Sequence, residues 1–156
     1  MDEISKLFGE EIPEIIKAEL LAKAKTVRED YIGRDFPSGN VAVAKVVLSN
    51  GAILFQEGTS RARSPSPLPT PKSAGGIFEP SIDSHSQRLM ETDAEYKILS
   101  ALALTLLEEL KQVQVEGKLY LYTERKPCES CQNILRQFRE LFPSVGISVV
   151  WDHPYP

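Results

Sequence analysis

One segment of the chain, from Leu89 to Val113, is predicted to form a helix that is apolar nearly all round. Its centre runs from Ile98 to Leu107 and is interrupted by Ser100 and Thr105. A membrane span needs about 20 apolar residues, so this stretch is too short and is expected to be a buried helix. A helix without a polar face has to be covered on several sides by other elements. The chain is therefore expected to fold in layers around it.

The other sequence patterns predict an alternation of helices and strands. Residues 13–30 have apolar positions at helical spacing, and Pro13 suits a first helical turn. Two β-rich runs, 41–48 and 53–55, flank Asn50-Gly51, a dipeptide that favours a tight type I′ hairpin turn. Three further elements follow the buried helix, namely a strand over 119–122, a helix over 132–142 and a strand over 147–151.

This order of elements predicts an α/β fold, a three-layer α/β/α sandwich with a mixed sheet. The strand–helix–strand unit in the second half requires a right-handed crossover, with a parallel strand pair or a sheet-edge variant of one. The hairpin would supply an antiparallel edge. The length of 156 residues predicts a single domain over 1–156, in which residues 1–38 form an N-terminal helix and connection.

A proline-rich loop is expected over residues 60–82. Five prolines and the pair Gly75-Gly76 exclude regular structure from this segment. Loops of this length in a compact domain are either functional or flexible surface insertions, and the sequence leaves both alternatives open.

The two cysteines of the chain lie together in Pro127-Cys128-Glu129-Ser130-Cys131, which excludes a framework of scattered disulfides. They follow a predicted strand and open a helix, where helix-terminal amides favour the thiolate. Two thiolates on one helix face suit either redox chemistry or half of a zinc site. A catalytic zinc needs only one further protein ligand besides these two, because water takes the fourth position.

Asp93-Ala94-Glu95 lies near the start of the buried helix and supplies candidate carboxylates. Glu95 stands one turn before Ile98 and Leu99, so its carboxylate is expected on the apolar face, where it must be paired. The alternative is structural, because Thr92-x-x-Glu95 has the spacing of a capping box.

Taken together, Asp93-Ala94-Glu95 and Pro127-Cys128-Glu129-Ser130-Cys131 resemble the two motifs of the zinc-dependent nucleobase deaminases, with a strand between them. The chain is similar to the cytidine deaminase-like superfamily, and more closely to bacterial polymorphic-toxin domains that deaminate cytosine in single-stranded DNA. The resemblance covers about Gly39 to Trp151. It implies Zn²⁺ held by Asp93, Cys128 and Cys131, with His85 as the rival to Asp93.

The same resemblance implies that Glu95 moves the protons while a zinc-activated water attacks C4 of cytosine. It places the base edge at the amide of Ala94 and near Lys126 and Pro127, and the sugar or base at Asn40. The cations that flank the predicted site, and would suit a polymer substrate, are Arg61, Arg63, His85, Arg88, Arg125 and Lys126.

A net charge of −4 argues mildly against nucleic-acid binding, but the net negative charge is concentrated in the first 30 positions, which hold eight acidic and five basic residues. The family likeness further implies a monomer that is secreted within a larger toxin, acts in the cytoplasm of a target bacterium and is neutralised by an immunity protein. RNA or free nucleosides remain alternative substrates. A non-enzymatic zinc or redox Cys-x-x-Cys module remains the alternative from another class.

Overall fold

The computed structural model describes residues 12–36, 39–61, 63–66, 69, 72–79, 94–110, 115–125 and 129–153, without the side chains of 109, 110, 125, 129–131 and 153. No helix within these ranges is long and apolar enough to cross a membrane.

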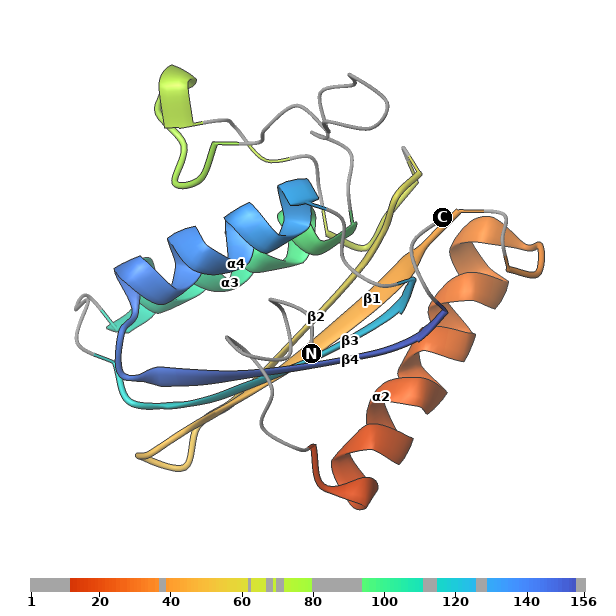
Figure 1. Cartoon of the computed structure of the whole chain (residues 1–156), viewed down its shortest axis with the longest axis horizontal. Helices are drawn as coiled ribbons and strands as arrows, with labels where there is room; N and C mark the ends of the chain where they lie inside the picture. The colour runs from red at the N-terminus through yellow and green to blue at the C-terminus, as the bar shows by residue number, and fades with distance from the viewer. Residues whose placement is uncertain are drawn as a thin grey trace.

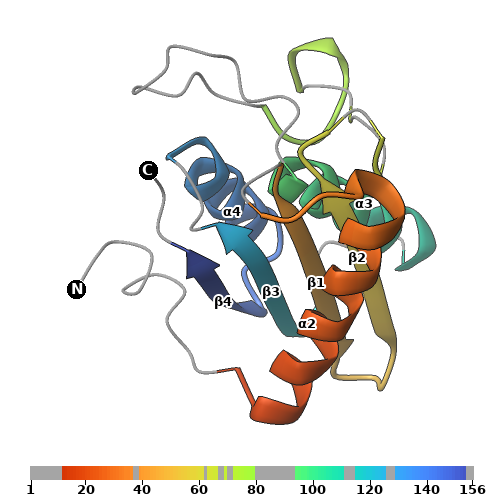
Figure 2. The same ribbon diagram turned by 90° about the vertical axis from the view of Figure 1, so that its right-hand side faces the viewer.

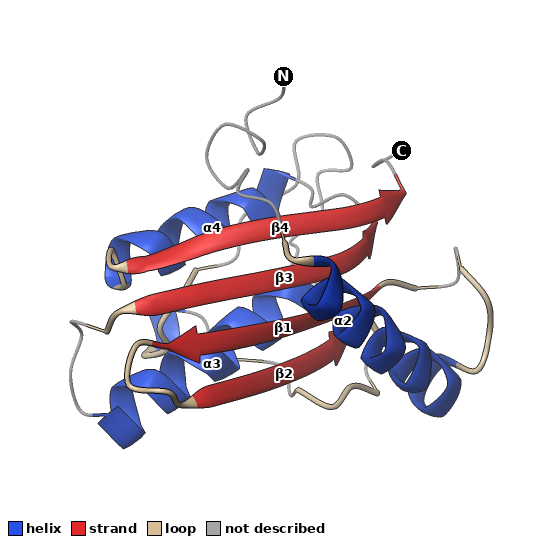
Figure 3. Cartoon of the chain, turned by 90° about the horizontal axis from the view of Figure 1, so that it is seen from below, coloured by secondary structure: helices blue, strands red, loops and turns tan. Residues whose placement is uncertain are grey.

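A four-stranded mixed sheet forms the centre of the molecule (Figure 3). Its strands are β1 (Val41–Leu48), β2 (Ile53–Thr59), β3 (Gly117–Arg125) and β4 (Val145–His153). They lie in the order β2-β1-β3-β4, with β1 antiparallel to both of its neighbours and β3 parallel to β4. The mixed sheet, the hairpin at its edge and the parallel pair in the second half are therefore confirmed.

Helices cover both faces of this sheet. Helix α2 (Glu14–Val27) crosses one face, and helices α3 (Ala94–Leu110) and α4 (Glu129–Leu141) lie side by side on the other (Figure 1 and Figure 2). This arrangement confirms the three-layer α/β/α sandwich expected from the order of elements.

The alternation of side chains along β1 divides the core into two apolar clusters. Ala42, Ala44 and Val46 point into the cluster under α3 and α4, whereas Val41 and Val43 point toward α2. Such alternation follows from the two-residue period of a strand, and a sheet covered on both faces favours apolar residues on both. Strand β1 is therefore apolar on both faces except at Lys45, which pairs with Glu19 of α2.

Helix α3 is buried along most of its apolar centre, as its composition requires. Ile98, Leu99, Leu102 and Leu106 are completely buried, but Leu104 is 46% exposed. The cover predicted around this helix is therefore incomplete on the side of Leu104.

Three local expectations need correction. The β1–β2 connection is a three-residue loop over 49–51, because Leu48 pairs with Ala52 and Gly51 takes φ +91°, rather than a two-residue type I′ turn. Helix α2 continues into a π-helical turn, Arg28–Ile32, before Gly33 at φ +72° ends it. In the proline-rich segment, Lys72–Ala74 form a short 3₁₀ helix, since such a turn needs only three residues between prolines.

Candidate functional site

Three side chains from different elements meet at one end of the sheet. Asn40 directly precedes β1, Thr123 lies near the end of β3, and Glu95 is the second residue of α3. The antiparallel register pairs Ala42 with Thr123, so the start of β1 and the end of β3 are adjacent. We call Asn40, Glu95 and Thr123 the carboxylate cluster.

The Glu95 carboxylate is 3% exposed and is held through its Oε1 atom. This oxygen accepts a hydrogen bond from the Thr123 hydroxyl at 2.6 Å and another from the Asn40 amide at 2.9 Å. The Asn40 amide also lies 2.9 Å from Thr123 Oγ1. Burial of a carboxylate is costly without such partners, so these bonds both permit the burial and fix the orientation of the group.

Close packing between α3 and β2 sets the position of the carboxylate. A Cβ atom added at Gly58 would lie 3.3 Å from the carbonyl oxygen of Ala94 and 2.9 Å from Ile98 Cγ2. The missing side chain of Gly58 therefore lets the first turn of α3 lie directly against β2. The expectation that Glu95 lies on the buried face of its helix is confirmed.

A second group of contacts ties the end of β2 to Asn40. The backbone N–H of Asn40 donates to Ser60 Oγ at 2.8 Å, and its carbonyl accepts from the Ser60 N–H at 2.9 Å. Lys97, which is 2% exposed, donates from Nζ to the carbonyls of Thr59 at 2.9 Å and Arg61 at 2.6 Å. The buried ammonium group thus holds the segment that pairs with Asn40.

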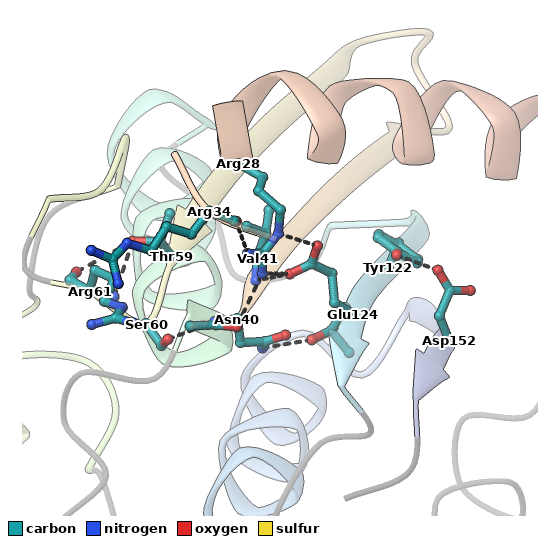
Figure 4. A network of polar contacts seen from close by, with 12 residues as sticks. Arg28, Arg34, Asn40, Val41, Thr59, Ser60, Arg61, Tyr122, Glu124 and Asp152 are labelled. Atoms are coloured by element: carbon teal, nitrogen blue, oxygen red, sulfur yellow. Dashed lines mark hydrogen bonds and ion pairs between the residues drawn. The ribbon is translucent and has the colours of Figure 1, made fainter. Parts of the chain in front are cut away.

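The structure brings four of the predicted site residues together, namely Asn40, Ala94, Glu95 and Arg61. A Cβ at Gly39 would lie 3.0 Å from Arg61 Nε, so the Arg61 side chain runs beside the residue that precedes Asn40 (Figure 4). Arg61 is exposed, which leaves it accessible to a substrate approaching this end of the sheet.

The remaining predictions concern residues that the structure does not describe. His85, Asp93, Lys126, Pro127 and Cys128 lie outside the described residues, as do the side chains of Arg125 and Cys131, and Thr92 of the capping-box alternative. Within the described ranges, no group of three or more His, Cys, Asp or Glu side chains could hold a metal ion.

The backbone next to the proposed ligands nevertheless follows the predicted order. Helix α3 begins at Ala94, directly after Asp93, and α4 begins at Glu129, directly after Cys128. Both helices start at the end of the sheet where β3 ends (Figure 1).

Thr123 is a member of the cluster that the sequence analysis did not single out. It follows Leu119 and Leu121 at every second position of β3, and both leucines belong to the core under α3 and α4. A hydroxyl at a position where the alternation requires an apolar side chain is the signal that would have identified it.

On the opposite face of the same strand, Tyr122 donates from its hydroxyl to Asp152 Oδ2 at 2.6 Å. Burial, together with this carboxylate, raises the pKa of the Tyr122 phenol well above its ordinary value. The phenol is therefore a neutral hydrogen-bond donor that joins β3 to β4, and it lies on the side of the sheet that faces α2.

A layered α/β domain with a buried carboxylate at the start of a helix is the arrangement expected of a deaminase domain. Residues 78–153 match the family model described as Toxin-deaminase, the BURPS668_1122 family of deaminases. This match supports a bacterial toxin deaminase domain of the cytidine deaminase-like type, and with it a hydrolytic deaminase. No curated protein matches the chain.

The matched segment includes Glu95, Thr123 and the positions of all three proposed zinc ligands. Asn40 and Arg61 precede it, as do β1, β2 and α2. The carboxylate cluster is therefore completed by a residue from outside the family match.

Proposed function

We propose that this domain is a zinc-dependent enzyme that converts cytosine to uracil in single-stranded DNA. The observation that carries the proposal is the buried Glu95 carboxylate, held by Thr123 and Asn40 at the start of α3. A carboxylate fixed in this way suits proton transfer, which requires a group within hydrogen-bond reach of the reacting atoms.

Asp93, Cys128 and Cys131 are proposed to hold the zinc ion, with His85 as the alternative to Asp93. The donor chemistry fits this metal, because zinc accepts thiolate sulfur and carboxylate oxygen, and three protein ligands leave a position for water. When bound, zinc would supply the activation that makes water a nucleophile near neutral pH.

The residues of the chain would then carry the proton transfers. The water oxygen bonds to C4 of cytosine, and Glu95 accepts the proton that the water loses. Glu95 passes this proton to N3, then takes the remaining proton from the hydroxyl group now bonded to C4 and delivers it to the amino group. The C4–N4 bond breaks, the C4 carbonyl forms and ammonia leaves. Asn40 and Thr123 keep the carboxylate oriented throughout. The Ala94 amide and the backbone near Lys126 and Pro127 are proposed to hold the edge of the base.

A polymer substrate is proposed because an exposed cation stands beside this cluster. Arg61 lies next to Asn40, and Arg125 and Lys126 follow Thr123 in the chain. Cations at such positions suit the phosphates of a single strand, whose unpaired bases are accessible without unpairing a duplex.

The biological setting is part of the same proposal. A deaminase toxin domain would act as a monomeric single domain over residues 1–156, at the C-terminus of a secreted interbacterial toxin. Its target would be DNA in the cytoplasm of another bacterium. A cognate immunity protein would protect the producing cell.

The test measures uracil formation on single-stranded DNA, duplex DNA, RNA and free cytidine in parallel, together with the zinc content of the purified protein. Glu95→Gln should abolish uracil formation, whereas Glu108→Gln, a matched control at an exposed carboxylate of the same helix, should not. Cys128→Ser should lower the zinc content. Conversion of RNA or free cytidine instead of DNA would replace the proposed substrate, and full activity in Glu95→Gln would refute the proposed mechanism.

A further inference from the structure

An ion pair between Arg28 and Glu124 joins the end of the α2 layer to the end of β3. Arg28 Nε donates to Glu124 Oε2 at 2.8 Å, and Arg28 Nη2 donates to Oε1 of the same carboxylate. The two side chains are only 11% and 12% exposed. This two-point geometry holds both groups in a fixed orientation, unlike a single contact between exposed charges (Figure 4).

The pair also holds the backbone on both sides of Asn40. Arg28 Nη2 donates to the carbonyl of Gly39 at 3.1 Å, and Glu124 Oε1 accepts the N–H of Val41 at 2.8 Å. A third contact runs from Arg28 Nη1 to the Arg34 carbonyl at 2.6 Å, which anchors the segment leading toward Gly39. The chain is thereby fixed immediately before and immediately after Asn40.

Glu124 is also the neighbour of Thr123 along β3. Successive residues of a strand point to opposite faces, so Glu124 faces the α2 layer while Thr123 points toward Glu95. Asn40 and Thr123, which donate hydrogen bonds to the Glu95 carboxylate, are therefore direct chain neighbours of residues that belong to the ion pair or are bonded by it.

We infer that Arg28 and Glu124 are positioning residues, which hold Asn40 and Thr123 in the geometry that orients the Glu95 carboxylate. The inference rests on the proposed function for the role of Glu95 in proton transfer. Arg28 begins the π-helical turn after α2, which lies before the segment that the deaminase family matches. The inference therefore makes this turn a determinant of the reaction rate.

The competing explanation is that the pair only attaches α2 to the sheet. The chain offers a matched control, because Lys45 of β1 and Glu19 of α2 form another ion pair between the same two layers at 2.7 Å. If the Arg28–Glu124 pair only attached α2 to the sheet, its loss would change kcat no more than the loss of the Lys45–Glu19 pair.

The experiment compares Glu124→Gln and Arg28→Lys with the control Glu19→Gln. The amide oxygen introduced by Glu124→Gln can still accept the Val41 N–H but lacks the charge. The ammonium group introduced by Arg28→Lys keeps the charge but cannot reach the Glu124 carboxylate and the carbonyls of Arg34 and Gly39 together. Both variants should lower kcat on single-stranded DNA about 10- to 100-fold with KM within about twofold, as expected when a reacting group is slightly misplaced. Glu19→Gln should leave both constants within about twofold.

A second measurement does not depend on activity. In two-dimensional NMR spectra, the side-chain amide resonances of Asn40, assigned with Asn40→Asp, should shift in Glu124→Gln and Arg28→Lys but not in Glu19→Gln. Unchanged Asn40 resonances, or a kcat loss equal to that of Glu19→Gln, would overturn the inference. An inactive wild-type domain would instead refute the proposed function, and the NMR comparison would still decide whether the pair positions Asn40.

Discussion

Replacing Thr123 with valine tests the carboxylate cluster most directly. Valine has nearly the same shape as threonine, so the substitution removes the hydroxyl without leaving a cavity. The hydroxyl is completely buried and donates to Glu95 Oε1 at 2.6 Å, while the Asn40 amide lies 2.9 Å from it. The variant therefore removes the hydrogen bond to the Glu95 carboxylate and the contact with the Asn40 amide. The Asn40 amide keeps its own hydrogen bond to Glu95.

The expected cost follows from the first of these bonds. A hydrogen bond to a charged group contributes about 1.5 to 3 kcal/mol to stability, and we expect Thr123→Val to lower the free energy of unfolding by about that amount. In a domain of this size, this corresponds to a decrease in Tm of roughly 3 to 12 °C. The deaminase rate should fall as well, because the carboxylate loses a contact that orients it.

Chemical denaturation followed by circular dichroism measures the change in stability. Thr123→Ser is the control, since it keeps the hydroxyl and removes one methyl group at a cost of about 1 kcal/mol, and it should retain most of the activity. In a Glu95→Gln background, Thr123→Val should cost about 1 kcal/mol less, because the bond then involves a neutral acceptor. A cost below about 0.5 kcal/mol, or an equal cost in both backgrounds, would refute the reasoning.

Three other perturbations give separate checks. Lys97→Met should lower the free energy of unfolding by about 2 to 4 kcal/mol, because the carbonyls of Thr59 and Arg61 lose a charged donor. Urea denaturation measures this, and a change below about 1 kcal/mol would contradict it. Gly39→Ala should cost about 1 to 3 kcal/mol by the same measurement, since Gly39 has φ +73° and its Cβ would crowd Arg61, and an unchanged midpoint would argue against that strain. Burial beside Asp152 raises the pKa of Tyr122, so its stabilising contribution is complete below about pH 10 and is lost as the pH rises through the higher pKa of the folded state. Tyrosinate absorbance up to about pH 11 should therefore be the same in Tyr122→Phe and wild type. A smaller signal in the variant would show that Tyr122 ionises in this range and that its pKa is not raised.

The layers of the fold were predictable because they depend on local patterns. The apolar helix around Ile98 required cover, and the two β-rich runs on either side of Asn50-Gly51 predicted a hairpin. The three-residue loop at Gly51 was not predicted, since the same Asn-Gly dipeptide is compatible with more than one loop length. The length of the loop depends on how β1 and β2 pair along their full length.

The site was predictable only in part. Glu95 stood out because a carboxylate on an apolar helix face needs a partner, and Asn40 was indicated by the family likeness. Which side chains would surround Glu95 depends on the order of strands in the sheet, which puts Thr123 beside Asn40 across 83 positions of chain. The contact between Arg28 and Glu124 spans 96 positions, and no local sequence pattern predicts it.

The sequence distances within the carboxylate cluster also have a consequence for how the protein folds. Asn40 is 55 positions from Glu95, and Glu95 is 28 positions from Thr123. Chain segments of this length close slowly compared with a hairpin, so the β1–β2 pair can form well before β1 finds β3. During synthesis, Glu95 is complete before β3 has been made, and its carboxylate then lacks the strand that provides Thr123. The reactive geometry therefore requires that β3 has been made and has paired with β1.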